Sequence, residues 1–247
     1  MGMETAHIVI DGKEYPAEPG EFLLTVAKRN GIDIPTLCHH DALPGQASCR
    51  LCLVEVMEHD AKKVVVSCVF PITDGLEVIT DSDKIFRLRK NVLRLLKERA
   101  PEDSKLDALC AEYGVVPDER FIPVKDEKCV MCGLCTRACT ILGSNAITTA
   151  MRGTLKKVTT PFDEPSDRCI GCGSCARICP AEAIDFEETQ DVRRIWDKTF
   201  ELLKCAECGK PYATPEELDF LLKNGVVSSD SSRLCLDCRK RAAVGNI

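Results

Sequence analysis

The chain has 247 residues, a formal net charge of −6 and 17 cysteines. This length allows one large domain or two to four small ones. The negative charge opposes a nucleic-acid-binding function, which needs a basic surface. Because the cysteine content is far above average, cysteine chemistry is the first guide to function.

The N-terminal sequence MGMETAHIVI has no basic stretch followed by an apolar run and a small-residue cleavage site, so we expect no signal peptide. No segment approaches about 18 uninterrupted apolar residues, so we expect no membrane span. We therefore expect a cytoplasmic protein. In that reducing compartment, clustered cysteines are expected to be metal ligands rather than disulfides.

The first 80 residues predict a small mixed fold of the β-grasp type. HIVI and EYPA are typical of two strands, joined at the turn dipeptide Asp11-Gly12. EFLLTVAKRNG predicts a helix that ends at Gly31. RLCLVEVME and KKVVVSCVF predict two further strands.

Four cysteines lie around these strands, separated by gaps of 10, 2 and 15 residues: Cys38, Cys49, Cys52 and Cys68. Plant-type ferredoxins bind a [2Fe–2S] cluster through C-x4-C-x2-C and a distant cysteine, and here the first gap is longer. His39 and His40 leave open a Rieske-type site, in which two histidines replace two cysteines. Because four cysteines already complete the site, we expect both histidines to lie at the surface or around the ligands.

Residues 7–80 resemble the N-terminal [2Fe–2S] domain of the large iron–sulfur subunit of complex I, on the segments IPTLC, SCRLCLVEV and the later SC. The same module occurs in the small diaphorase subunit of NAD-coupled hydrogenases and in iron-only hydrogenases. The resemblance implies a [2Fe–2S] cluster held by the four cysteines.

The segment SDKIFRLRKNVLRLLKERA predicts a helix with Ser82 as its N-cap. We expect its basic side chains to be solvated or to face another subunit: Lys84, Arg87, Arg89, Lys90, Arg94 and Lys97. After this helix, the resembling family usually carries a [4Fe–4S] site of the form H-x3-C-x2-C-x5-C. Other residues occupy those four positions here: Ala100, Ser104, Asp107 and Tyr113. We expect this cluster to be absent and Cys110 to be a buried or inert thiol.

The segments CVMCGLCTRACT and CIGCGSCARICP both have the spacing C-x2-C-x2-C-x3-C, by which bacterial ferredoxins bind [4Fe–4S] clusters. The first three thiolates of each box wrap one cubane, and the fourth begins a helix that leads to the other cluster. Cluster one is therefore assigned to Cys129, Cys132, Cys135 and Cys179. Cluster two is assigned to Cys139, Cys169, Cys172 and Cys175. We expect three glycines to bring the backbone close to sulfide: Gly133, Gly171 and Gly173.

Two further C-x2-C pairs stand 26 residues apart near the C-terminus: Cys205, Cys208, Cys235 and Cys238. Such pairs hold a tetrahedral ion, usually zinc. Four thiolates also suit a single iron or a [2Fe–2S] cluster, so zinc and a redox iron site both stay open. The sequence between the pairs predicts a helix with Thr214 as N-cap and Pro215 at its first position. DVRRIWDKTFELL is interpreted as a short helix before the first pair.

The predicted fold class is α+β with several domains. Residues 1–80 form a [2Fe–2S] β-grasp domain, and residues 81–125 form a helical connector, the vestige of the lost one-histidine, three-cysteine cluster region. Residues 126–188 form a bacterial-ferredoxin-type domain with two [4Fe–4S] clusters, and residues 189–247 form a helix plus a four-cysteine metal module.

No strand is followed by G-x-G-x-x-G and no G-x4-G-K-[ST] occurs, so we expect neither catalytic residues nor a substrate-converting site on this chain. The cysteine sets indicate an electron conduit. The resemblance implies a hetero-oligomer with a flavin- and NAD(H)-binding subunit and the small and large subunits of a nickel–iron hydrogenase. Electron bifurcation with soluble ferredoxin is compatible with this sequence. The alternatives are the same relay in an NAD-linked formate dehydrogenase, a free ferredoxin-like carrier and a nucleic-acid regulator.

Overall fold

The computed structural model describes residues 5–58, 61–116, 119–120 and 127–244. The chain divides into two compact units, Met1–Leu134 and Cys135–Ile247, and each is described by itself. The helices in the described ranges are too short or too polar to traverse a bilayer. The predicted boundary at residues 125–126 lies outside the described residues.

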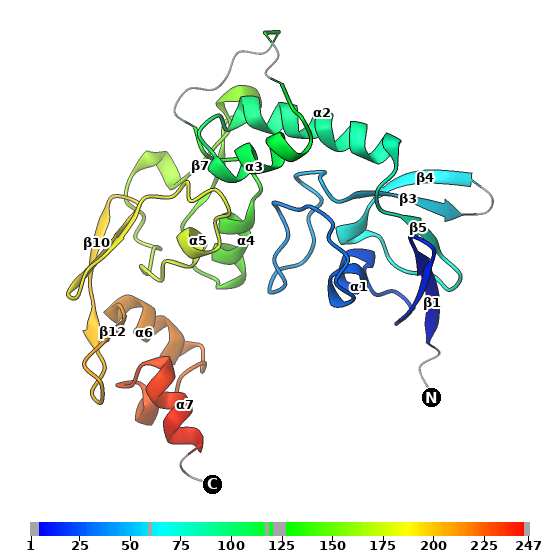
Figure 1. Cartoon of the computed structure of the whole chain (residues 1–247). Helices are drawn as coiled ribbons and strands as arrows, with labels where there is room; N and C mark the ends of the chain where they lie inside the picture. Colours follow the sequence, from blue (N-terminus) through cyan, green and yellow to red (C-terminus); the bar gives the residue numbers. More distant parts are fainter. Residues whose placement is uncertain (1–4, 59–60, 117–118, 121–126, 245–247) are drawn as a thin grey trace. The chain divides into compact units, whose positions relative to one another are not determined.

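The first unit begins with a five-stranded sheet in the order β2-β1-β5-β3-β4 (Figure 1). Its strands are β1 (Ala6–Ile10), β2 (Lys13–Ala17), β3 (Leu53–Glu58), β4 (Ala61–Val66) and β5 (Glu77–Ile79). The pair β1–β5 is parallel and the other pairs are antiparallel. Helix α1 (Leu23–Arg29) packs its apolar side against this sheet, so the strands and helix predicted for this region are confirmed.

The turn between β1 and β2 explains why these two strands pair. Asp11 and Gly12 have φ values of 49° and 79°, the left-handed values that a two-residue hairpin turn requires. The pairing of Ile10 with Lys13 then follows, and Ala6, Ile8 and Ile10 of β1 all point into the hydrophobic core. The Asp11-Gly12 hairpin predicted from the sequence is confirmed.

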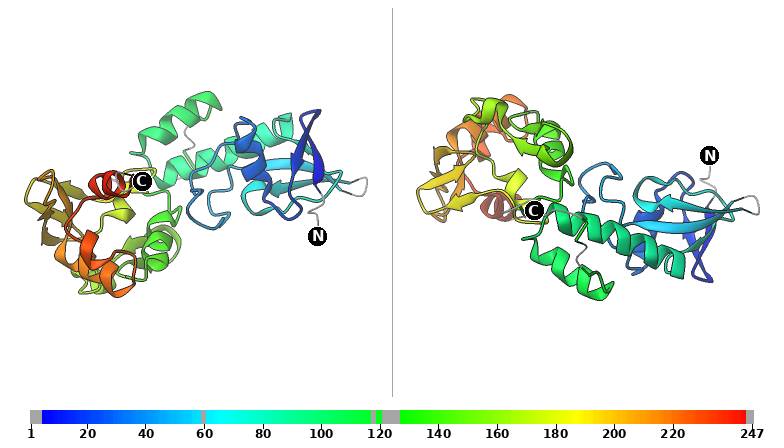
Figure 2. Two further views of the ribbon diagram at one scale, coloured as in Figure 1. Left: turned by 90° about the horizontal axis from the view of Figure 1, so that it is seen from below. Right: turned by 90° about the horizontal axis from the view of Figure 1, so that it is seen from above.

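Helix α2 (Asp83–Arg99) follows the sheet, and α3 (Ser104–Glu112) lies beside it in both figures (Figure 2). The Ser82 hydroxyl accepts a hydrogen bond from the Ile85 N–H at 3.2 Å, which confirms the predicted N-cap. The rings of Phe86 and Tyr113 stack with centroids 4.9 Å apart. This stack attaches the chain after α3 to α2.

Arg89 of α2 is buried, with 3% of its surface exposed. Its guanidinium donates hydrogen bonds to the carbonyl oxygens of Leu53 at 2.7 Å, Thr80 at 2.9 Å and Leu51 at 3.1 Å. It also donates to the Tyr113 hydroxyl at 3.3 Å. The expectation that the basic side chains of this helix are solvated or face another subunit is therefore wrong for Arg89. A long donor with five N–H groups satisfies backbone carbonyls that the sheet leaves unpaired.

Replacing this side chain tests its structural role. In Arg89→Met, several buried carbonyls lose their donors, so we expect the unit to lose on the order of 3 kcal/mol of stability. The measurement is the urea concentration at the midpoint of unfolding, with unfolding monitored by circular dichroism. Arg87→Met is the matched control, because Arg87 is exposed on the same helix. Equal midpoints for the two variants would contradict the assignment.

The second unit consists of short elements. Its helices are α4 (Leu134–Ile141), α5 (Ser174–Arg177), α6 (Pro215–Lys223) and α7 (Leu236–Val244). Strands β6 (Thr148–Ala150) and β7 (Lys157–Thr159) pair, as do β11 (Leu203–Lys204) and β12 (Pro211–Ala213). Strands β8 (Phe186–Glu188), β9 (Val192–Ile195) and β10 (Lys198–Glu201) form a three-stranded sheet in the order β10-β9-β8. The 3-10 turns of this unit are η2 (Gly153–Leu155), η3 (Pro161–Asp163) and η4 (Ser229–Ser231), and the first unit contains η1 (Ser67–Val69).

The short helix predicted around DVRRIWDKTFELL is wrong, because this segment forms the antiparallel hairpin β9–β10. Trp196 and Asp197, at φ 53° and 56°, make its two-residue turn. Arg193 and Ile195 are buried on β9 while Arg194 between them is exposed. This alternation with a period of two is the strand signal that the helical interpretation missed.

Candidate iron–sulfur centres and four-thiolate site

The four N-terminal cysteines are all buried, with at most 4% of their surface exposed. Cys38 and Cys49 lie on the loop between α1 and β3, Cys52 directly precedes β3, and Cys68 lies in η1 after β4. The Cys49 N–H donates to the Cys38 sulfur at 3.4 Å, and Cys52 lies next to Cys68 in the same interior. The structure thus brings the predicted [2Fe–2S] ligands together in pairs.

The ionisation of these thiols shows what the site needs. The hydrogen bond with Cys68 lowers the pKa of Cys52 to about 7, and the same contact, with burial, raises the pKa of Cys68. The contact with Cys38, with burial, raises the pKa of Cys49. Neighbouring thiols therefore share protons, and four thiolates form here only if a cationic centre compensates them. An iron–sulfur cluster fits this donor set.

The two histidines contact protein groups around this loop. The Nδ1 atom of His39 lies 3.2 Å from the Lys28 ammonium and 3.6 Å from the Asp41 carboxylate. The Nδ1 atom of the exposed His40 accepts a hydrogen bond from the Ala42 N–H at 3.1 Å. These contacts support the four-cysteine ligand set over the Rieske-type alternative.

In the first [4Fe–4S] box, the Met131 N–H donates to the Cys129 sulfur at 3.4 Å. Gly133 has a φ of 75°, so the loop turns back in a conformation that glycine adopts without strain. Cys132 is buried, as is Cys135, and the boundary between the two units falls between them, after Leu134. The ligand set of cluster one therefore stays a prediction.

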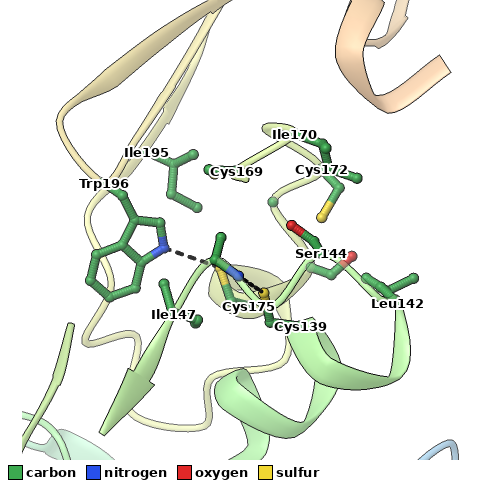
Figure 3. Close-up of a pocket in the computed structure, with 13 residues that line it drawn as sticks. Cys139, Leu142, Ser144, Ile147, Cys169, Ile170, Cys172, Cys175, Ile195 and Trp196 are labelled. Carbon is green, nitrogen blue, oxygen red and sulfur yellow. Dashed lines mark hydrogen bonds between the residues drawn. The ribbon is translucent and has the colours of Figure 1, made fainter. Parts of the chain in front are cut away.

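For cluster two, the second unit contains a small cavity (Figure 3). Among the residues that line it are the four cysteines assigned to this cluster: Cys139, Cys169, Cys172 and Cys175. The set combines one cysteine of the first box with three of the second, which supports the exchange of the fourth ligand. Cys139 lies in the last turns of α4, so the expectation that it begins a helix is wrong.

Two N–H groups point at sulfurs of this cavity (Figure 3). The Ala146 N–H donates to the Cys139 sulfur at 3.2 Å, and the Trp196 indole N–H donates to the Cys175 sulfur at 3.4 Å. Burial raises the pKa of Cys175 to about 11 and also raises the pKa of Cys169. The cavity thus favours neutral thiols until a cation binds. Donors to cluster sulfurs tune reduction potential, so Trp196 is a functional residue that the sequence analysis missed.

Gly171 and Gly173 of the second box, at φ 67° and 70°, also make room for aromatic rings. A β-carbon on Gly171 would lie 2.7 Å from the Phe200 ring, and one on Gly173 would lie 2.7 Å from the Phe186 ring. The glycines expected from close approach to sulfide are therefore also required by the packing of the sheet β8–β10.

The C-terminal cysteines converge as well. The sulfurs of Cys205, Cys208, Cys235 and Cys238 all lie within 4.8 Å of one another. Cys205 follows β11, while Cys235 directly precedes α7 and Cys238 lies in its first turn. The predicted N-cap of α6 is confirmed, because the Thr214 hydroxyl accepts from the Glu217 N–H at 3.0 Å. This donor set fits a thiolate-bound metal.

The remaining cysteine, Cys110, lies buried near the end of α3, and burial raises its pKa. Among the positions that would hold the lost cluster, the Tyr113 hydroxyl accepts from Arg89, and Asp107 forms an ion pair with Lys97 at 2.5 Å. These side chains are engaged within the unit. Cys110 therefore fits an inert thiol.

Comparison with protein families matches residues 4–83 to a 2Fe-2S iron-sulfur cluster binding domain. Residues 125–184 and 168–213 each match a 4Fe-4S dicluster domain. These matches cover the cysteine sets of the [2Fe–2S] site and of both boxes. The second dicluster match also extends across Cys205 and Cys208.

The chain is 28% identical, over 94% of its length, to the alpha subunit of an NADPH-Fe(3+) oxidoreductase of Geobacter sulfurreducens. It is 28% identical, over 82% of its length, to a G-type subunit of the NADH-quinone oxidoreductase of Rhizobium meliloti. A 35% identity over 39% of the chain links it to the NADH-ubiquinone oxidoreductase 78 kDa subunit of Candida albicans. The chain covers 30%, 26% and 13% of these relatives, in the order Geobacter, Rhizobium and Candida, less than a third of their length.

Among solved structures, one chain of the NAD+-reducing [NiFe]-hydrogenase in the H2-reduced state superimposes with a TM-score of 0.63. The match covers 93% of this chain and 99% of that one at 23% identity, which shows a shared fold.

One substitution tests the exchanged ligand. In Cys139→Ser, cluster two loses a thiolate that the second box cannot replace, so we expect loss of about four irons per chain and of one electron paramagnetic resonance signal. Cys110→Ser is the control and should leave the iron content unchanged. Iron loss in Cys110→Ser would instead reveal a ligand in the connector.

A second substitution tests the indole donor. Trp196→Phe removes a hydrogen bond that stabilises the more negative, reduced state, so we expect the potential of cluster two to fall. The expected shift is on the order of 40 mV, equivalent to about 1 kcal/mol for one hydrogen bond. Redox titration followed by electron paramagnetic resonance measures it, with cluster one as internal reference. An unchanged potential would contradict the role of the Trp196 indole as a hydrogen-bond donor that tunes cluster two.

The buried thiol sets, the cavity and the family matches lead to one conclusion: the chain carries the [2Fe–2S] and [4Fe–4S] binding domains of an iron–sulfur electron-transfer protein related to these oxidoreductase subunits.

Proposed function

We propose that this chain relays electrons between a flavin- and NAD(H)-binding subunit and the catalytic small and large subunits of a nickel–iron hydrogenase. The observation that carries the relay is the cavity lined by cysteines of both boxes, in a chain that also gathers four buried thiols in its N-terminal domain. The nicotinamide partner is favoured by the names of the relatives, which couple NADH or NADPH to another acceptor. The hydrogenase partner is favoured by the shared fold.

In this proposal, three sets of cysteines hold the clusters. The [2Fe–2S] cluster is bound by Cys38, Cys49, Cys52 and Cys68. Cluster one is bound by Cys129, Cys132, Cys135 and Cys179, and cluster two by Cys139, Cys169, Cys172 and Cys175. When bound, iron–sulfur clusters supply one-electron redox chemistry, which lets a two-electron donor be coupled to a separate reaction.

The residues of the chain contribute burial, ligand position and hydrogen bonds. The thiols of the N-terminal set are almost completely removed from water, which disfavours loss of iron and sets a low dielectric around the centre. The N–H groups of Ala146 and Trp196 stabilise negative charge on the sulfurs of Cys139 and Cys175. The role of the protein is therefore to set potentials, while the conversion of substrate takes place on other subunits.

The same geometry suits the relay of an NAD-linked formate dehydrogenase, or a free ferredoxin-like carrier. Bifurcation of electrons between NAD and a soluble ferredoxin is a further extension of the relay. These possibilities differ in what accompanies the chain, so they are distinguished by the composition of the native complex.

The test is to purify the native complex anaerobically through a tag on this chain and to measure flavin, nickel, molybdenum and tungsten together. We expect flavin and nickel without molybdenum or tungsten. Molybdenum or tungsten without nickel would move the relay to a formate dehydrogenase, and a chain that purifies alone would contradict the subunit role.

A functional readout completes this test. NADH should reduce the clusters of the complex within the mixing time, whereas the isolated chain should stay oxidised because the proposal places hydride transfer on the flavin-binding subunit. Dithionite reduces both samples and serves as the control. Direct reduction of the isolated chain by NADH would contradict the proposed division between subunits.

A further inference from the structure

The C-terminal sulfurs have the spacing of ligands to a single ion. The sulfurs of Cys208 and Cys235 lie 3.7 Å apart, and all four lie within 4.8 Å of one another. A tetrahedral zinc with bonds of about 2.3 Å separates its sulfurs by about 3.8 Å. The observed separation agrees with this value.

An iron–sulfur cluster is the competing occupant, since the dicluster match extends to residue 213 and covers Cys205 and Cys208. In a [2Fe–2S] cluster two thiolates bind each iron, and bridging sulfides hold the two irons apart. Its four thiolates therefore need a wider arrangement than the one observed. The geometry selects one tetrahedral ion over a cluster. A single iron has the same geometry, and zinc is the usual structural ion of four thiolates closed on all sides.

The ion would join two segments, the hairpin β11–β12 and the start of α7. Cys205 lies at the tip of the hairpin β11–β12, where its N–H donates to the Lys210 carbonyl at 2.9 Å. The Cys235 N–H donates to the Cys205 sulfur at 3.3 Å, and the Tyr212 hydroxyl donates to the Ser232 carbonyl at 2.6 Å. The hairpin is thus attached to the start of α7 at the metal site.

The other end of this hairpin reaches the loop of cluster two. Strand β12 ends at Ala213, and the next residue, Thr214, is fully buried. Its hydroxyl donates to the Ile170 carbonyl at 2.6 Å while it accepts from the Glu217 N–H. Ile170 lies between Cys169 and Cys172, so the N-cap of α6 directly contacts the cluster loop.

A buried arginine makes a second connection between α6 and this loop. Arg193 is 3% exposed and donates to the Gly171 carbonyl at 2.7 Å. The same side chain contacts the Glu217 carboxylate at 3.2 Å and the Glu188 carboxylate at 2.6 Å. Two consecutive carbonyls of the cluster loop are therefore held by groups whose position depends on α6.

We propose that Cys205, Cys208, Cys235 and Cys238 bind one structural zinc ion, which fixes α6 so that Thr214 and Glu217 hold the loop around cluster two. The inference rests on the proposed ligand set of cluster two. Zinc in this position transfers no electron, and Thr214, Glu217 and Arg193 are positioning residues for the neighbouring cluster.

The first test measures metals in the anaerobically purified complex, with zinc and iron counted per copy of this chain after subtraction of the metals of the partner subunits. We expect one zinc in the wild type, and loss of that zinc in Cys205→Ser/Cys208→Ser. Iron lost from this variant in place of zinc would overturn the zinc assignment. Cys139→Ser tests the ligand set of cluster two separately, since it should abolish the cluster-two signal whatever the C-terminal cysteines bind. If that signal is lost in Cys139→Ser while the wild type holds no zinc, the zinc inference fails and the proposed ligand set stands.

The second test measures coupling to cluster two in a variant that keeps all thiolates. Thr214→Val removes the hydrogen bond to Ile170 together with the N-cap bond from the Glu217 N–H, and it preserves the shape of the side chain. We expect cluster two to lose its signal about fivefold faster under a chelator, the factor that corresponds to about 1 kcal/mol for one hydrogen bond. We also expect its spectrum to shift while zinc stays bound and the signal of cluster one is unchanged.

Ser229→Ala is the matched control, because Ser229 lies in the same C-terminal module in η4. The zinc-free variant should show the same selective loss of cluster two as Thr214→Val. Rates and spectra of cluster two equal to wild type in Thr214→Val, or in the zinc-free variant, would overturn the proposed coupling.

Discussion

Thiols held close together in a protein interior resist ionising together, and this constraint shapes the N-terminal domain and the cavity of cluster two. The free-energy cost of bringing thiolates into a low-dielectric interior is offset only when a cation binds all of them. The chain meets this requirement in its N-terminal domain with cysteines that are 1–4% exposed, and in the second unit with a cavity lined by four cysteines. The loops that direct several sulfurs inward are irregular. Some of their backbone carbonyls and N–H groups therefore find no partner within a helix or a sheet.

Buried arginines satisfy those carbonyls in both units. Arg89 donates to Leu51 and Leu53, the residues on either side of Cys52. Arg193 donates to Gly171, which directly precedes Cys172. In each case, a side chain from a neighbouring helix or strand fixes the backbone beside a cysteine. A guanidinium suits this role because its planar N–H groups reach several acceptors at once and it stays charged at all relevant pH values.

The sequence predicted what depends on local signals. Cysteine spacing, the Asp11-Gly12 turn and the Ser82 and Thr214 caps are encoded within a few residues, and the structure shows each element where it was expected. The hairpin β9–β10 was misread because its two-residue turn consists of Trp196 and Asp197, which are unusual at positive φ. Arg89, Arg193 and Trp196 could not be assigned from their neighbours in sequence. Their acceptors at or beside the cysteines, at Leu51, Gly171 and Cys175, lie 21 to 38 residues away in the chain.

Helix α4 carries Cys135 and Cys139, which are four residues apart and so lie on the same side of one helix. With the proposed ligand sets, this single helix serves both cubanes. Insertion of either centre would anchor the helix through one of these two thiols. The thiol that this helix offers to the second centre would then come from a segment that the first centre already fixes.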